Sequence, residues 1–212
     1  MDSIAHVLIN NCIVRNSNRG LGIQHRDEGT VSDVVFSNII LDCHLFSDVW
    51  WGKAEPIYIT AYRRATANNK DAGWRLPKGE THGKVGEVKN IYFTDIKCTS
   101  ENGVYVSAES ADKISNIYFD AVDVMLNKTT SIPGGVYDRR PCEAEGLIKT
   151  NTSAFYFDKA TNIILRNCSV TWGENKPLYY AHGLKSSGVK NLKMTNFEGK
   201  AAFDKIKAIV VE

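Results

Sequence analysis

Several side chains that could act as acids or bases stand beside short apolar segments of the chain. His25, Asp27 and Glu28 occur together in the string QHRDEG, and Glu55 directly precedes the apolar string PIYIT. Two carboxyl groups flanking a sugar linkage can hydrolyse it, one as general acid and the other as general base. These four residues are the candidate catalytic groups. The alternatives are solvated surface charge for the carboxylates and a packed or surface imidazole for His25.

A second set of residues could bind sugar rings. Tyrosine recurs at the middle position of the strings PIYIT, GVYVS, AFYFD and PLYYA. Aromatic rings offer flat apolar faces that suit sugars, although the same column could simply stack between adjacent strands. The pair Trp50-Trp51 either walls a cleft or covers the side of the fold. The candidate substrate-binding residues are Gln24, Trp51, Tyr58, Tyr105, Tyr156 and Tyr179.

The elements that position these residues follow from an internal repeat. Six similar segments begin at His6, Asp33, Asn90, Asn116, Asn162 and Asn191, with starts 27, 57, 26, 46 and 29 residues apart. Their second position is always apolar: Val7, Val34, Ile91, Ile117, Ile163 and Leu192. The fourth position is also apolar and the third is mixed, which predicts a β-strand with one buried face.

Each strand should end in a bend. The sixth position of the repeat reads Asn11, Asn38, Asp95, Ala121, Asn167 and Asn196. Asn tolerates the left-handed backbone conformation, so these positions predict a corner, with the side chains forming a hydrogen-bonded ladder between coils. The strings GLGIQ, PIYIT, GVYVS, AFYFD and PLYYA predict one further strand in each coil.

Several short strands per coil, with no helical pattern between them, predict an all-β fold. We expect a single domain over residues 1–212 that forms a right-handed parallel β-helix, or β-solenoid, with the column from Val7 to Leu192 inside. Long insertions near 63–87 and 127–153 interrupt it. Such insertions gather on one face of a solenoid, often the binding face.

Composition excludes several classes of protein. The 26 basic and 24 acidic residues leave a net charge of +2, so no nucleic-acid surface is expected, and no apolar run is long enough to span a membrane. The N-terminus lacks the features of a signal peptide, which places the chain in the cytoplasm unless an upstream segment precedes it. The five cysteines show no C-x-x-C pair and the histidines no ligand spacing, so we expect reduced thiols, no metal and no cofactor.

The string RGLGIQHR, from Arg19 to Arg26, gives a more specific resemblance. Together with the preceding HVLINNCIVRNSN and the following VSDVVFSNIIL, it resembles the later coils of polygalacturonase-like glycoside hydrolases (family 28). WWGKAEPIYIT and YDRRPCEAEG resemble uncharacterised bacterial relatives of that family. The resemblance implies a parallel β-helix that acts on pectic or related polysaccharide.

The chain departs from that family in its catalytic motifs. The Asn-Thr-Asp and Asp-Asp motifs that carry the family's catalytic aspartates are absent, and the Arg and Lys that hold the substrate carboxylate fall on Gly22 and Gln24. Hydrolysis by the family mechanism is therefore not expected, because that mechanism needs both an acid and a base. Gln24 can still bond a sugar hydroxyl.

Three functions fit these observations. The first is an incomplete carbohydrate-active protein equivalent to the C-terminal coils of such a hydrolase. The second is a non-catalytic carbohydrate-binding or scaffold module, and the third is a β-helix lyase or epimerase. The expected partner is an oligo- or polysaccharide. The first coil should also leave an open, sticky strand edge, which another copy of the chain or an upstream domain would cover.

Overall fold

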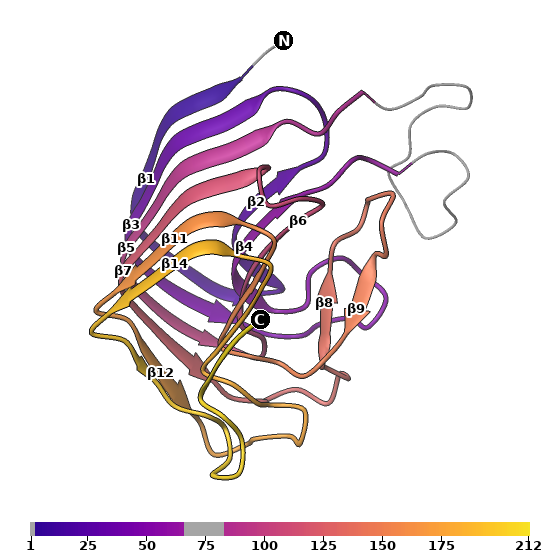
Figure 1. Ribbon diagram of the computed structural model, residues 1–212. Coiled ribbons are helices and arrows are strands. Elements are labelled where there is room, and N and C mark those ends of the chain that lie inside the picture. The colour runs from indigo at the N-terminus through magenta and orange to yellow at the C-terminus, as the bar shows by residue number, and fades with distance from the viewer. Residues whose placement is uncertain (1–2, 66–82) are drawn as a thin grey trace.

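The computed structural model describes residues 3–65 and 83–212, and this part of the chain consists of strands and loops without a helix (Figure 1). The larger of two parallel sheets has eight strands. Its main path runs through β1 (Ile4–Ser17), β3 (Thr30–Cys43), β5 (Glu87–Ser100), β7 (Ile114–Leu126), β11 (Thr161–Arg166) and β14 (Lys190–Thr195). The short strand β12 (Ser169–Trp172) pairs with β7, and β15 (Glu198–Gly199) pairs with β12.

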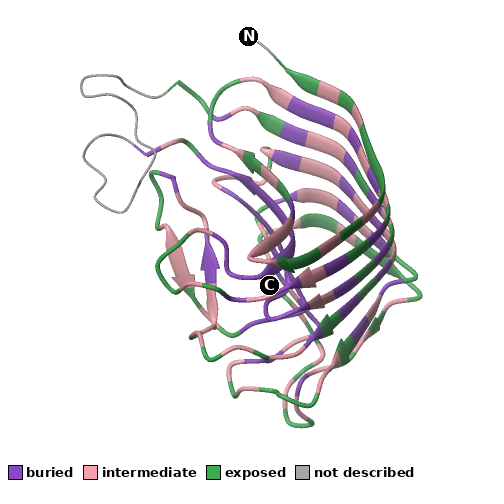
Figure 2. Ribbon diagram, turned by 180° about the vertical axis from the view of Figure 1, so that it is seen from behind, coloured by how far each residue is buried: buried purple, intermediate pink, exposed green. Residues whose placement is uncertain are grey.

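The second parallel sheet has six strands. In spatial order they are β16 (Ile209–Val211), β13 (Leu184–Ser187), β10 (Phe155–Asp158), β6 (Val104–Ala108), β4 (Glu55–Ala61) and β2 (Arg19–His25). Outside the 127–153 insertion, the chain passes back and forth between the two parallel sheets, and their facing apolar residues form the main core. Burial increases from the edge strand β1 towards the inner strands (Figure 2). The prediction of an all-β fold with parallel strands is confirmed.

The predicted interior column is confirmed by the strand register. Val7 lies opposite Val34, which lies opposite Ile91, and the pairing continues through Ile117, Ile163 and Leu192. The fourth position forms a parallel column. Its rings Phe36, Phe93 and Phe119 stack with centroids 5.1 Å apart at each step. Period-two alternation thus identified the buried face of each long strand.

The predicted corners have the expected backbone. All six residues at the sixth position have positive φ, between 51° and 55°. The structure adds a second corner that we did not predict, at the first position of the repeat: His6, Asp33, Asn90, Asn116, Asn162 and Asn191, with φ between 55° and 61°. The signal was present, because five of these six residues are Asn or Asp.

Side-chain ladders run along both corners. At the first position, the amide nitrogen of each later residue donates to the preceding one, from Asn191 through Asn162, Asn116 and Asn90 to Asp33, over 2.6–2.9 Å. At the sixth position the ladder is interrupted. Asn38 donates to Asn11 and Asn196 to Asn167, but Asn167 turns to Asp120 because Ala121 offers no acceptor.

The second predicted strand set is confirmed in four coils and wrong in the fifth. Gly22, Tyr58, Tyr105 and Tyr156 pair across successive strands, but the next partner is Lys185 and not Tyr179. The string PLYYA imitates the alternation of a strand. Its backbone instead makes a turn, in which Tyr180 N donates to Pro177 O, and Leu178 is 90% exposed.

The insertion near 127–153 contains a two-stranded antiparallel hairpin, β8 (Val136–Asp138) and β9 (Leu147–Lys149). Much of the other insertion, near 63–87, lies outside the described residues. All five cysteines are free thiols, as predicted, and four of them are buried.

Candidate functional site

Five of the predicted site residues meet in one depression beyond the end of β2. Strand β2 is the edge strand of the six-stranded sheet, and the turn at 26–29 leads from it into β3. The depression has a volume of about 380 Å³. Its walls include Gln24, His25, Asp27, Glu28 and Trp51, together with Ile4, Arg26, Thr30, Val31, Arg64 and Pro141. We refer to it as the β2-end pocket.

Gln24 and His25 supply neutral hydrogen-bonding groups to the pocket. Gln24 is exposed, and its amide nitrogen donates to the carbonyl of Arg140 over 2.8 Å. His25 is half-buried, with Nε2 3.3 Å from Gly29 O. Desolvation by burial lowers the pKa of His25 below its ordinary value, so the imidazole is neutral at pH 7.

The two carboxylates of the pocket have different partners. Asp27 forms a two-point ion pair with Arg64, one bond being 2.9 Å from Nε to Oδ1, which favours the charged form of the carboxylate. Asp27 is therefore poorly suited to be a general acid. Glu28 is exposed and accepts a bond from the backbone nitrogen of Lys84 over 3.2 Å.

Glu28 also borders a neighbouring depression. This second hollow has a volume of about 460 Å³ and shares Glu28 and Thr30 with the β2-end pocket. Its other walls include the cationic side chains Lys84 and Lys113. Glu28 thus stands between two adjoining polar hollows, where it can accept hydrogen bonds from hydroxyl groups.

Glu55 does not belong to the pocket, which corrects its prediction as a catalytic group. Its carboxylate is completely buried and accepts bonds from Arg19 Nε over 3.2 Å and from Lys53 N over 2.7 Å. The Arg19 guanidinium also lies 3.6 Å from the centroid of the Tyr58 ring. A carboxylate enclosed in this way stabilises the fold and cannot reach a ligand.

The tyrosine column is in the predicted register but cannot serve as an open platform. Tyr58, Tyr105 and Tyr156 are only 1%, 0% and 8% exposed, because the β8–β9 hairpin covers them. The Tyr137 ring stacks on Tyr105 with centroids 4.5 Å apart. Tyr58 Oη donates to Asp138 O over 2.7 Å. The alternative interpretation, a ladder that stabilises adjacent strands, is the one that fits.

Tyr179 does not line the β2-end pocket, and its role in substrate binding stays a prediction. It packs edge-on against Tyr180 with centroids 5.3 Å apart, and its ring lies against Gly134 and Gly135 in the insertion. Burial raises the pKa of its phenol to about 12.

Arg26 is a residue that sequence reasoning missed. Its guanidinium is buried and donates to Pro141 O over 2.7 Å, to His25 O over 2.8 Å and to Arg139 O. It therefore fastens the insertion to the end of β2. The positive charge of Arg26 gave no indication of this role in the sequence, because the carbonyl groups of the insertion that accept its bonds lie more than 100 residues further along the chain.

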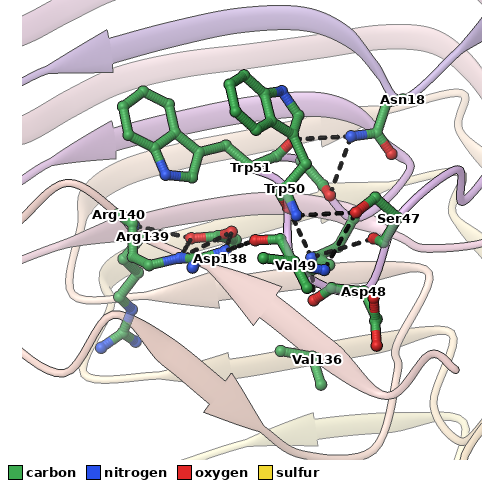
Figure 3. Close-up of polar contacts among 12 residues, drawn as sticks. Asn18, Ser47, Asp48, Val49, Trp50, Trp51, Val136, Asp138, Arg139 and Arg140 are labelled. Carbon is green, nitrogen blue, oxygen red and sulfur yellow. Dashed lines mark hydrogen bonds and ion pairs between the residues drawn. The ribbon is translucent and has the colours of Figure 1, made fainter. Parts of the chain in front are cut away.

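Arg139 and Arg140 make structural ion pairs. Arg139 reaches Asp158 and Arg140 reaches the buried Asp138, each over 2.7 Å. Figure 3 shows Arg140 between Asp138 and the loop that carries Trp50 and Trp51. The insertion thus supports the aromatic wall of the pocket.

Among residues 3–65 and 83–212, no group of three or more His, Cys, Asp or Glu side chains is placed to hold a metal ion. No helix of the described part is long and apolar enough to cross a membrane. Comparison of the chain with protein-family models, with curated proteins and with solved structures finds no match in any of the three. The geometry of the pocket itself must therefore support any assignment of function.

Proposed function

We propose that this chain is a carbohydrate-binding protein with a right-handed parallel β-helix fold, and that the β2-end pocket is its ligand site. The alternation of the chain between two parallel sheets supports the fold. Right-handedness is the expectation because crossovers between parallel strands are right-handed in nearly all proteins.

The observation that carries the function is the composition of the pocket wall. Gln24, the neutral His25 and Glu28 offer donors and acceptors for hydroxyl groups, and Trp51 offers an aromatic face. Sugar ligands need this combination, because their rings have hydroxyl edges and apolar C–H faces. The resemblance of RGLGIQHR to polygalacturonase-like glycoside hydrolases points to the same ligand class, since Gln24 and His25 belong to that string.

Hydrolysis is not part of the proposal. Among the candidate carboxylates, Asp27 is paired with Arg64 and Glu55 is buried against Arg19, so neither is suited to act as the second group beside Glu28. The inverting mechanism of the resembling family needs an acid and a base on opposite sides of the bond. We therefore expect no release of reducing ends when the purified chain is incubated with polygalacturonate.

Isothermal titration calorimetry with a panel of pectic and neutral oligosaccharides tests the proposal. We expect at least one class to bind, and Glu28→Ala to weaken that binding about tenfold by removing an acceptor. Glu198→Ala, an exposed carboxylate on β15, is the matched control and should bind as the unaltered chain does. Absence of binding across the panel would favour the scaffold alternative.

We also propose that the outer edge of β1 is covered in the working protein, by a second copy of the chain or by an upstream segment. The supporting observation is apolar exposure. On this strand Ile4, Leu8 and Ile13 are 61%, 62% and 60% exposed. A long apolar strand edge is a site for pairing with another strand.

A further inference from the structure

The loop at 46–51 exposes large apolar side chains beside the pocket. Val49 is 73% exposed, Trp50 is 68% exposed and Phe46 is 56% exposed. Covering a side chain as large as Trp removes a large apolar area from water, which favours binding. A cluster of exposed apolar side chains of this kind is characteristic of binding surfaces.

The backbone of this loop is held firmly by a buried ammonium group. Lys53 is 3% exposed, and its Nζ donates to Trp50 O over 2.7 Å, to Asp48 O over 3.1 Å and to Ser47 O over 3.4 Å. An ammonium group has three donors, and all three are used on one loop. Lys53 thus holds the backbone carbonyl groups of the segment that carries Trp50.

Three further side chains complete the support (Figure 3). Asn18 Nδ2 donates to Trp51 O over 2.7 Å, and Arg140 donates to Val49 O over 2.9 Å. Ser47 Oγ accepts bonds from the backbone nitrogens of Val49 and Trp50 over 3.1 and 3.0 Å. The backbone carbonyl groups from Ser47 to Trp51 therefore all accept hydrogen bonds, while the side chain of Trp50 remains in solvent.

The two indoles form one continuous surface. The ring centroids of Trp50 and Trp51 are 6.0 Å apart and the ring planes differ by 23°. Trp51 lines the β2-end pocket, so Trp50 extends the pocket wall outward. Rigid aromatic groups lose little conformational entropy on binding, which makes a preorganised pair effective.

We propose that Trp50 and Trp51 are a stacking platform for consecutive pyranose rings, and that Lys53 is the positioning residue that holds it. The ligand class is an oligosaccharide with an unsubstituted C–H face, in which one ring sits in the pocket against Trp51 and the next lies on Trp50. This inference rests on the proposed function. It adds the expectation that binding affinity depends on the length of the oligosaccharide.

The test compares a monosaccharide with oligosaccharides of increasing length, again by calorimetry. Trp50→Ala should weaken oligosaccharide binding about tenfold and leave monosaccharide binding unchanged, because only the longer ligand reaches Trp50. Lys53→Met should likewise weaken oligosaccharide binding by a similar factor and leave monosaccharide binding unchanged. It should also speed proteolysis of the loop at 46–51. A general loss of fold would weaken both ligands equally.

Two controls make the result decisive. Leu178→Ala removes a side chain that is 90% exposed in the turn at 177–180, and Lys97→Met removes an exposed ammonium from β5; both variants should bind like the unaltered chain. If Trp50→Ala binds every length normally while Glu28→Ala loses affinity, the platform is refuted and the proposed function stands. If no sugar binds the unaltered chain, both are refuted.

Discussion

At the residue scale, buried polar groups hold loops of the protein in place. Glu101 is the clearest case. Its carboxylate accepts bonds from the backbone nitrogens of Thr129 and Thr130 over 2.8 and 2.6 Å, and from Lys128 Nζ over 2.9 Å. Burial by itself raises the pKa of Glu101. The hydrogen bonds from these backbone nitrogens, from Lys128 and from the hydroxyl groups of the same threonines outweigh that effect and lower the pKa to about 2.

The lowered pKa predicts a pH-dependent contribution to stability. Because the unfolded chain has the ordinary pKa of 4.5, Glu101 contributes fully above that value, and its contribution is lost as pH falls from 4.5 towards 2. Glu101→Gln should reduce the free energy of unfolding by about 2–4 kcal/mol at pH 7 and by much less near pH 2. Urea unfolding at both pH values measures this.

Glu28→Gln is the control, since Glu28 is exposed. Its effect should stay within about 0.5 kcal/mol at either pH. Equal destabilisation by Glu101→Gln at both pH values would contradict the argument, because the effect would then not depend on the charge.

At the element scale, the corners decide how the strands stack. Asn116 lies in the middle of the uninterrupted ladder, donating to Asn90 over 2.9 Å and accepting from Asn162 over 2.6 Å, with φ of 56°. The sixth-position ladder lacks this continuity at Ala121, which has φ of 54° and borders a hollow that also touches Asp95. The two corners therefore offer opposite tests.

Asn116→Ala should destabilise the fold by about 2–3 kcal/mol, because it removes two ladder bonds and the short polar side chain that lets Asn adopt the left-handed conformation. Ala121→Asn should stabilise the fold by about 1 kcal/mol, because Asn tolerates that conformation and can connect Asp95 with Asn167. Both changes are measured by urea unfolding. Destabilisation by Ala121→Asn would show that ladder continuity does not set corner stability.

At the scale of the whole molecule, the two ends of the strand stack are open and complementary. The ladder amides donate towards the N-terminal end, so Asn11 makes no onward bond from Nδ2 within the described residues, and Asn196 Oδ1 meets no donor there. A head-to-tail contact would therefore join donors to acceptors and β1 to β14. Such a heterologous contact can repeat along a filament.

We expect the purified chain to self-associate as concentration rises, with light scattering as the measurement. Ile13→Lys on the edge strand should reduce association, because an edge lysine opposes strand pairing. Ile40→Lys is the matched control, since Ile40 lies opposite Ile13 on the inner strand β3 and is also half-exposed. A monomer at every concentration would rule out a second copy of the chain as the cover of β1.

The sequence by itself determined the parts of this protein that depend on local periodicity. Alternation over a few residues assigns the inward face of a strand, so the column from Val7 to Leu192 and the tyrosine register could be predicted. Repeated Asn marked the sixth-position corners, and would equally have marked the first-position corners. Adjacent residues such as Gln24, His25 and Glu28 stayed together in the fold because one strand end carries them.

Only the tertiary structure decided which outward side chains meet solvent. Alternation places Tyr105 outside its strand, but the hairpin that covers it comes from more than 30 residues further along the chain. Likewise Glu55 is enclosed by Arg19, which lies 36 residues earlier in the chain. These contacts follow from chain crossings distant in sequence, and no local pattern encodes them. For that reason the predicted tyrosine platform was wrong, whereas the residues at the end of β2 remained together.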